Sequence, residues 1–466
     1  MSDLHQTSIT FHGGAGTVTG ANFLFDTAGS KFLIDCGLFQ GGKIVEDKNR
    51  EPFPYAPAKI DALFVTHAHL DHIGRIPKLV HDGFRGQIYS TPPTRDIAEL
   101  VLLDSLGVMG KEARATNKPL LYEETDVRAT LNLWQTVEYQ QPFEPAPGLT
   151  TTFHDAGHIL GSALIEFSAG WRNGSIAAAG TKRKIVFTGD LGNSPSPLLP
   201  ETAALTGINY LIIESVYGDR LHEGVEARRN KLEDVIENTM RAGGTLLIPA
   251  FSIERTQELL YEIEQMMAEG RIPAVPVYLD SPLAIKITAI YSKFHSYFNQ
   301  RVADPDLIRD GLFNFPNLHK TLSTEESRAI PFSARKIIIA GSGMSNGGRI
   351  LHHEKHYLTD PKNALLLMGY QSAGSLGRAL SDGVKQVNIL GEKIAVRAAV
   401  MTLTGYSAHR DRDGLMAFVN QTADSLQCVY VAMGEPQASL FLAQRLRDYL
   451  GLEAVAPRAA EKFMLD

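Results

Sequence analysis

The sequence predicts an α/β protein, a sandwich that carries an α/β insertion. Over the first ~200 residues, short apolar or β-branched runs alternate with loops, and most runs end at Gly, Asp or His. From about residue 208, mostly apolar runs are followed by helical stretches, the pattern of a parallel sheet covered on both faces. A chain of 466 residues is long for one core, which agrees with two domains.

Individual elements follow from the same patterns. In the first part, the helical period is clearest from Ile97 to Leu106, and in the second part Leu232, Val235, Ile236 and Met240 repeat at helical spacing. The apolar run 393–405, a helix near 411–423, the run 428–434 and a terminal helix complete the chain. The runs that predict the other strands are 8–16, 22–27, 31–37, 60–67, 86–91, 162–168 and 184–190, then 210–215, 244–250, 276–280, 336–343 and 364–370.

Composition excludes several classes of protein. Apolar residues make up 44% and charged residues 21%, as in ordinary globular proteins, and there is neither a run of apolar residues long enough to span a membrane nor a signal peptide. Cys36 and Cys428 lie in or beside apolar runs, so we expect buried thiols and a cytoplasmic protein. The net charge of −7 argues against non-specific coating of nucleic acid, but a local cluster of metal ions and arginines can reverse the field in one cleft.

Metal-capable side chains crowd the turn after the run at 62–65. In such a turn His67 and His69 can face one side while Asp71 and His72 face the other, so that one loop serves two metals. The missing ligands must come from later strand ends, where His158 and Asp190 are flanked by glycine. Imidazole and carboxylate suit zinc, and a lone histidine would more often be an ordinary core or surface residue. The set as a whole predicts a binuclear zinc site.

His-x-His-x-Asp-His followed by Gly-His and Gly-Asp resembles the signature of metallo-β-lactamase fold hydrolases. The resemblance implies an αββα sandwich and two Zn²⁺ per chain. It implies His67, His69 and His158 on one zinc ion, Asp71 and His72 on the other, Asp190 between them, and Asp35 orienting the ligand loop.

Motifs in the insertion resemble the β-CASP group, which contains the cleavage-and-polyadenylation endonuclease, ribonuclease J and DNA-repair nucleases. They are 211–220, 248–260, 279–284, 341–349, 369–378 and 405–411, and they are most similar to those of bacterial stand-alone RNA-processing members. The resemblance makes Glu214 the acidic motif and His409 a histidine motif; alone, they would be a helix cap and a helix-start residue. Because the strand–helix alternation changes near residue 208, we expect residues 1–207 and 405–466 to form the sandwich and 208–404 to form a β-CASP insertion of mostly parallel sheet.

One position departs from the group. Met433 stands where RNA-processing members have a histidine before Gly-Glu, and DNA-processing members have an apolar residue there. A thioether is a poor zinc ligand, and Met433 is otherwise an apolar gap filler. This is why we expect a weak second metal, and it leaves open whether RNA or DNA is the substrate.

The resemblance implies a nuclease that hydrolyses phosphodiester bonds of RNA through a hydroxide between two metals, in RNA processing or decay. Asp71, Glu214 and His409 are the expected catalytic residues, with His409 oriented by Glu214 and protonating the leaving oxygen. Gly-rich loops after apolar strands suit phosphate, so Ser342, Arg349, Ser375 and Arg378 are candidate RNA contacts, with Arg255 and Arg410 weaker choices.

Alternatives remain at this stage. They are a DNase, a catalytically weakened RNA-binding homologue, and a small-molecule hydrolase of the same fold, which the long insertion disfavours. RNA is the expected partner, DNA and a homodimer are further alternatives, and no membrane is expected. Nothing in the sequence separates an endonuclease from an exonuclease.

Overall fold

The computed structural model of the chain describes residues 6–465 except 28, 117, 173–174, 177–180, 304–310, 332–334, 370 and 373. It divides into two compact units. Unit 1 comprises Met1–Ser196, Pro200–Leu221 and His409–Asp466, and unit 2 comprises Pro197–Leu199 and His222–Ala408. No helix in the described ranges is both long and apolar enough to cross a membrane.

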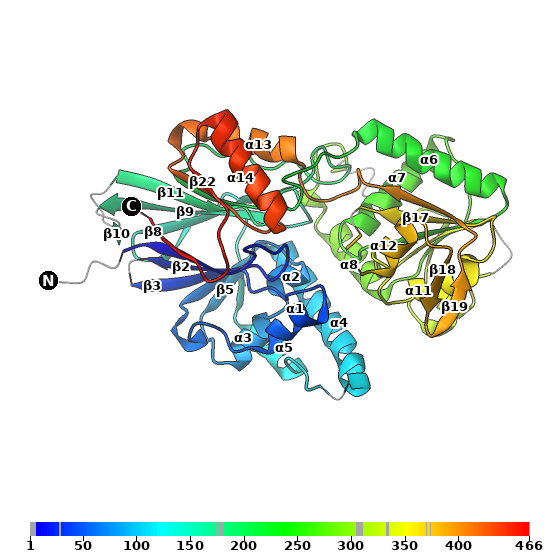
Figure 1. Cartoon of the computed structure of the whole chain (residues 1–466), viewed down its shortest axis with the longest axis horizontal. Coiled ribbons are helices and arrows are strands. Elements are labelled where there is room, and N and C mark those ends of the chain that lie inside the picture. Colours follow the sequence, from blue (N-terminus) through cyan, green and yellow to red (C-terminus); the bar gives the residue numbers. More distant parts are fainter. Residues whose placement is uncertain are drawn as a thin grey trace. The chain divides into compact units, whose positions relative to one another are not determined.

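Unit 1 contains two sheets that pack face to face, with helices on their outer faces (Figure 1). The first sheet has the strand order β23-β1-β2-β3-β4-β5-β6; the antiparallel strands β1–β3 lead into the parallel run β3–β6. Its strands are β1 Ser8–Gly13, β2 Asn22–Thr27, β3 Ser30–Ile34, β4 Ala62–Phe64, β5 Gln87–Ser90, β6 Trp134–Thr136 and β23 Lys462–Met464.

The second sheet has the order β22-β21-β12-β11-β9-β8-β7, and β10 pairs with β9. Strands β7, β8, β9 and β11 are antiparallel neighbours, whereas β11, β12, β21 and β22 run parallel. The strands are β7 Phe143–Ala146, β8 Leu149–Asp155, β9 Ala163–Arg172, β10 Ser175–Ile176, β11 Thr181–Phe187, β12 Tyr210–Ile213, β21 Cys428–Val431 and β22 Ala454–Val455.

A phenylalanine-rich core fills the space between these sheets. Alternation along a strand sends every second side chain inward, so Phe23 and Phe25 of β2 meet Phe167 of β9 and Phe187 of β11. A second apolar cluster lies between the second sheet and two C-terminal helices. The helices of unit 1 are α1 Lys43–Asp47, α2 Leu70–Ile73, α3 Ile76–His81, α4 Pro92–Thr116, α5 Glu124–Asn132, α13 Arg412–Asn420 and α14 Pro436–Leu450, with short 3₁₀ turns at Lys48–Arg50, Pro57–Lys59 and Ala423–Ser425.

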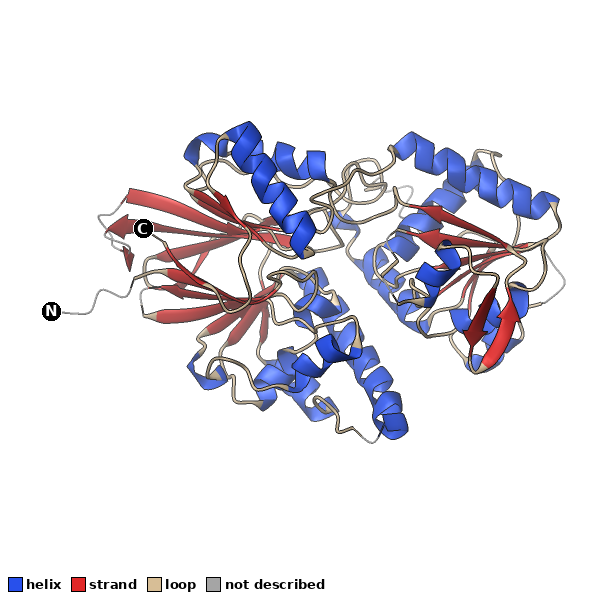
Figure 2. Cartoon of the chain, in the orientation of Figure 1, coloured by secondary structure: helices blue, strands red, loops and turns tan. Residues whose placement is uncertain are grey.

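Unit 2 is built on a sheet with the order β15-β14-β16-β13-β17-β20, parallel at every described pairing, with helices on both faces (Figure 2). The small hairpin β18–β19 stands apart from that sheet. Its strands are β13 Thr245–Pro249, β14 Val277–Leu279, β15 Leu318–Lys320, β16 Lys336–Ala340, β17 Ala364–Met368, β18 Gln386–Ile389, β19 Glu392–Ala395 and β20 Ala399–Leu403. Its helices are α6 Val225–Arg241, α7 Arg255–Ala268, α8 Pro282–Lys293, α10 Thr324–Arg328, α11 Ile350–Tyr357 and α12 Leu376–Ser381, with a 3₁₀ turn at His295–Tyr297.

The expected fold class, a sandwich with an inserted, mostly parallel α/β domain, is confirmed. The boundaries between the two compact units lie at residues 221/222 and 408/409. Both are later than the expected boundaries near 208 and 405. The reason is strand β12, which pairs with β11 and β21 and so belongs to unit 1. The helix expected at Ile97–Leu106 is the middle of the longer helix α4.

Candidate active site

The crowded ligand loop follows β4 and runs into the short helix α2. His67 and His72 are buried, and neighbouring backbone fixes the turn: the amides of Ala21 and Cys36 donate to the carbonyls of Asp71 and His72 at 2.9 and 2.8 Å. Gly37 passes so close that a Cβ on it would lie 1.5 Å from the carbonyl oxygen of Asp71. The loop conformation therefore depends on glycine at this one approach.

Three imidazoles and one carboxylate converge beside this loop. His67 Nε2 and His158 Nε2 lie 3.0 and 3.2 Å from His69 Nδ1, and 3.4 and 3.5 Å from Asp190 Oδ2. One ligand atom from each of the four residues lies within 4.8 Å of the others. The loop supplies two of these residues, the β8–β9 connection supplies His158, and the end of β11 supplies Asp190.

Electrostatics favour metal binding in this cluster. Burial, together with neighbouring imidazoles, holds the pKa of His69 and of His158 well below the ordinary value, and the pKa of His67 is lowered by burial and by His72. Neutral imidazole is the form that coordinates a metal ion. Three histidines and a carboxylate match the donor set that zinc prefers, so the residues fit the ion that the sequence implies.

His72 faces the other side of Asp190. Its Nε2 lies 3.4 Å from Asp190 Oδ1 and 4.0 Å from Asp71 Oδ2. This nitrogen is buried and has no hydrogen-bond partner among the described residues. A buried polar atom without a partner is unfavourable unless something else binds it, so its position fits a second cation shared by Asp71, His72 and Asp190.

Asp35 forms a hydrogen bond with His72. It lies at the end of β3, fully buried, and its Oδ2 is 2.7 Å from His72 Nδ1. The same carboxylate accepts the backbone N–H and the hydroxyl of Thr66, each at 2.8 Å. Although burial alone would lower it, the pKa of His72 is raised well above the usual value by Asp190 and Asp35. Thr66 was not singled out from the sequence, where a threonine before the histidines carries no signal of its own.

Glu214 and His409 form a second cluster around Asp190. His409 Nδ1 lies 3.4 Å from both carboxylate oxygens of Glu214 and 3.8 Å from Asp190 Oδ2. Glu214 is fully buried at the end of β12 and accepts the Leu191 N–H at 2.6 Å, so it is not a helix cap. Burial opposes a charge on His409, but Glu214 and Asp190 outweigh burial and raise its pKa to about 9. A protonated imidazole beside the ligand cluster can donate a proton to an anion bound there.

Backbone contacts fix the position of His409. It forms a β-bridge with Gly192, and the Arg410 N–H donates to the Leu191 carbonyl at 2.8 Å. The Arg410 guanidinium donates to the Gly192 carbonyl and to the Thr202 hydroxyl at 3.0 and 2.9 Å. Arg410 therefore holds the loops around His409, a use that the sequence does not indicate.

Met433 is a core residue. Its side chain is 1% exposed and belongs to the apolar cluster between the two sheets. Its backbone N–H donates to the Gly14 carbonyl at 2.5 Å, and its Cγ would be 3.2 Å from a Cβ on Gly14. This packing agrees with the apolar role expected from the sequence.

The four candidate phosphate contacts lie in unit 2, in the segments that lead from β16 to α11 and from β17 into α12. Ser342 Oγ accepts the Asn346 N–H at 3.1 Å, and Ser375 Oγ accepts the Arg378 N–H at 3.0 Å as the N-cap of α12. The Arg378 guanidinium forms an exposed ion pair with Asp382 at 2.9 Å. These contacts organise the loops.

Arg349 has a stronger internal partner. Its Nη1 donates to Asp280 Oδ1 at 2.7 Å and to the Thr321 carbonyl at 2.9 Å. Asp280 is fully buried, also binds His353 at 2.7 Å, and was missed because an aspartate after an apolar strand has many roles. Arg255, a weaker candidate, is buried and pairs with Glu258 at 2.6 Å.

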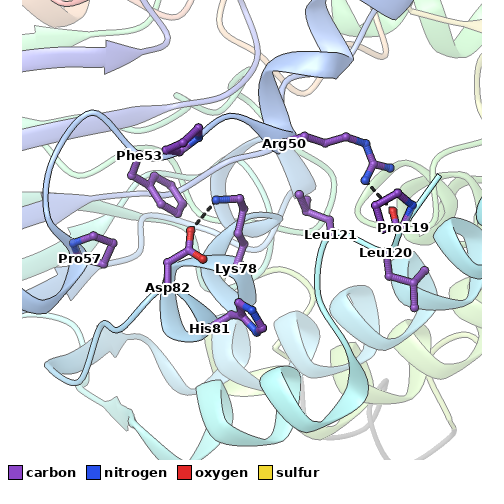
Figure 3. Close-up of a pocket in the computed structure, with 10 residues that line it drawn as sticks. Arg50, Phe53, Pro57, Lys78, His81, Asp82, Pro119, Leu120 and Leu121 are labelled. Carbon is purple, nitrogen blue, oxygen red and sulfur yellow. Dashed lines mark hydrogen bonds and ion pairs between the residues drawn. The ribbon is translucent and has the colours of Figure 1, made fainter.

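A cavity of about 590 Å³ lies elsewhere in unit 1, between the turns around Phe53, helix α3 and the loop before α5 (Figure 3). Its cations have protein partners: Lys78 pairs with Asp82, and Arg50 donates to the Pro119 carbonyl, both at 2.5 Å. None of the candidate metal ligands lines it. The cavity is therefore not the site described above.

Comparisons with known proteins match three domains along the chain. Residues 24–176 match a metallo-β-lactamase superfamily domain, residues 256–380 a β-CASP domain, and residues 393–457 a Zn-dependent metallo-hydrolase RNA specificity domain. A ribonuclease of Thermus thermophilus is 38% identical over 87% of this chain and 88% of its own length. The transcription termination factor FttA of Methanosarcina mazei is 33% identical over 96% of this chain and 70% of its own.

A solved structure from Enterococcus faecalis V583, described as a protein of unknown function, shares the fold. It superposes with a TM-score of 0.55 at 12% identity, over 99% of this chain and 100% of that one. At this identity the likeness concerns the fold alone.

We predict that Asp35→Asn lowers the affinity of the site for Zn²⁺ by roughly 10- to 100-fold, because His72 loses the carboxylate that orients it. Titration calorimetry of the metal-free protein measures this. Asp26→Ala is the control, since Asp26 forms only a partly exposed pair with Lys31 at 3.4 Å. Equal zinc affinity in the wild type and Asp35→Asn, with both folded by circular dichroism, contradicts the assigned role of Asp35.

Proposed function

The chain belongs to the β-CASP group of the metallo-β-lactamase superfamily, and we propose that it is a zinc-dependent ribonuclease that hydrolyses phosphodiester bonds of single-stranded RNA. The convergence of His67, His69, His158 and Asp190 supports the hydrolytic centre most directly. The RNA specificity domain and the relatives named ribonuclease and transcription termination factor support RNA as the substrate.

We assign a distinct task to each residue of the chain. His67, His69, His158 and Asp190 hold the first zinc ion, and Asp71, His72 and Asp190 hold the second. Two bound ions would supply an activated water and neutralise the scissile phosphate. Asp35 keeps His72 in the ligating orientation. His409, protonated beside Glu214, gives its proton to the oxygen that leaves phosphorus.

Asp71→Ala should reduce RNA cleavage by at least about 100-fold while leaving RNA binding within about threefold of the wild type, because chemistry needs the second ion and binding depends on other contacts. The assay uses zinc-loaded protein with end-labelled single-stranded RNA and DNA of one sequence. Asp82→Ala is the control, since that carboxylate pairs with Lys78 away from the ligands. Cleavage by Asp71→Ala at the wild-type rate would contradict the assignment of Asp71 as a metal ligand.

The same gels decide between RNA and DNA. The buried, apolar setting of Met433 is the observation that favours DNA, since DNA-processing members of the resembled group have an apolar residue at this motif. Faster cleavage of DNA than of RNA by the wild type would show that the protein is a DNase. The ladder also gives the cleavage position and the direction along the strand.

We further propose that the second zinc ion is bound more weakly than the first. The first ion has three imidazoles and a shared carboxylate, whereas the second has one imidazole and two carboxylates, and Met433 packs in the apolar core. Losing an imidazole ligand weakens a zinc site without preventing it, because water can complete the tetrahedron.

Met433→His should therefore raise the zinc content of protein dialysed against a mild chelator from about one to about two ions per chain. Elemental analysis measures the content, and cleavage at limiting zinc should rise in parallel. Met464→His is the control, because Met464 is an exposed residue on β23. If the wild type already retains two ions and the substitution changes neither quantity, Met433 is not the cause of weak binding.

A further inference from the structure

Phe251 is exposed at the carboxyl edge of the parallel sheet of unit 2. It lies two residues after β13, and its side chain is 43% exposed. Among the described phenylalanine and tyrosine side chains of unit 2, every other one is buried or of intermediate exposure. Single exposed apolar residues are common, so its position and support decide whether it has a role.

The ring of Phe251 rests directly on the backbone of Gly343. A Cβ on Gly343 would lie 2.7 Å from Phe251 Cδ2 and within 3.0 Å of two further ring atoms. The absence of a side chain at this position lets the ring lie against the loop between β16 and α11. The Thr256 hydroxyl also donates to the Phe251 carbonyl at 2.7 Å. The Phe251 ring is therefore held in a defined position by its packing against Gly343.

The loop beneath the ring is itself held in place. Gln371 Nε2 donates to the Gly343 carbonyl at 3.3 Å, and the Gly377 N–H donates to the Met344 carbonyl at 3.0 Å. These contacts join the loops that follow β16 and β17. A ring with rigid support loses little conformational freedom when a flat ligand stacks on it.

Uncharged hydroxyl groups lie near Gly341, two residues before Gly343. The hydroxyls of Ser281 and Ser252 lie 3.6 and 3.9 Å from where Gly341 would carry a Cβ, and Ser342 follows directly. The nearby Asp280 carboxylate is paired with Arg349 and lies 2.7 Å from His353 Nε2. Carboxyl ends of parallel strands are where α/β sheets bind ligands, and a nucleotide presents both a flat base and a phosphate.

We propose that Phe251 is a stacking platform for one base of the RNA strand, with the serine-lined Gly341–Gly348 loop facing the adjoining phosphate. The assignment rests on the proposed function, because it takes RNA as the ligand. Stacking on an aromatic ring is the usual way in which unpaired bases are held, and it tolerates every base. Phe251 thus contributes affinity for single strands without sequence preference.

The test measures binding of a labelled single-stranded oligoribonucleotide by protein that carries Asp71→Ala, so that the RNA is not cleaved. Adding Phe251→Ala should raise the Kd by roughly 5- to 100-fold, whereas Phe251→Tyr should stay within about twofold. Phe441→Ala is the matched control, since Phe441 is a phenylalanine of similar exposure, 39%, on α14 of unit 1. Gly343→Ala keeps the ring but displaces it, so it should weaken binding as well.

A spectroscopic signature separates stacking from a general loss of structure. Both native tryptophans, Trp134 and Trp171, are buried in unit 1. Phe251→Trp therefore adds an exposed indole whose emission RNA should quench. Wild-type affinity in Phe251→Ala together with unquenched emission overturns the stacking role while leaving the nuclease proposal standing. Absence of RNA binding by the Asp71→Ala parent overturns the proposed function, and this inference with it.

Discussion

Asp190 is the group on which the active site depends, because its two carboxylate oxygens serve different neighbours. One oxygen faces His67, His158 and His409, and the other faces His72. The side chain is almost fully buried, which would favour a neutral carboxyl group, yet surrounding histidines hold its pKa well below the usual value. The surrounding histidines therefore keep the Asp190 carboxylate charged in the protein interior, and this charge in turn stabilises their arrangement.

The same topological rule serves both units. In unit 1 Asp35, the ligand loop, Asp190 and Glu214 follow β3, β4, β11 and β12, all of which take part in parallel pairings, whereas His158 lies in the antiparallel β8–β9 connection. In unit 2 the serine-rich loops, Asp280 and Phe251 follow β13, β14, β16 and β17. Parallel strands bring residues distant in sequence to one edge, where loops are free to carry function while the strands carry the core.

Sequence patterns predict much of this structure because ligand spacing and hydrophobic periodicity depend only on residues that are close together in the sequence. The ligand spacing from His67 to His72 indicates a metal loop without tertiary information, and glycine beside His158 and Asp190 marks two strand ends. The pattern alone does not assign the segment that follows residue 208, because an apolar run such as 210–215 fits either parallel sheet equally well. Which sheet takes it is decided by pairing with β21, more than 200 residues later.

Side-chain partners were the least predictable feature. The sequence predicts that an arginine in a glycine-rich loop binds phosphate. Whether the Arg349 guanidinium is available depends on Asp280, which follows another strand. The sequence does not predict that Phe251 is exposed, because it lies in an apolar segment. Its exposure follows from the loop against which it packs. Met433 is the opposite case, where a single side-chain type was enough to predict an apolar environment.

Anomalous diffraction at the zinc absorption edge, from crystals of the zinc-loaded protein, tests the central claim most directly. We expect the strongest peak among His67, His69, His158 and Asp190, and a weaker peak beside His72 Nε2 and Asp71. If the protein cleaves RNA but its only zinc peak lies away from these residues, the assigned metal centre is wrong.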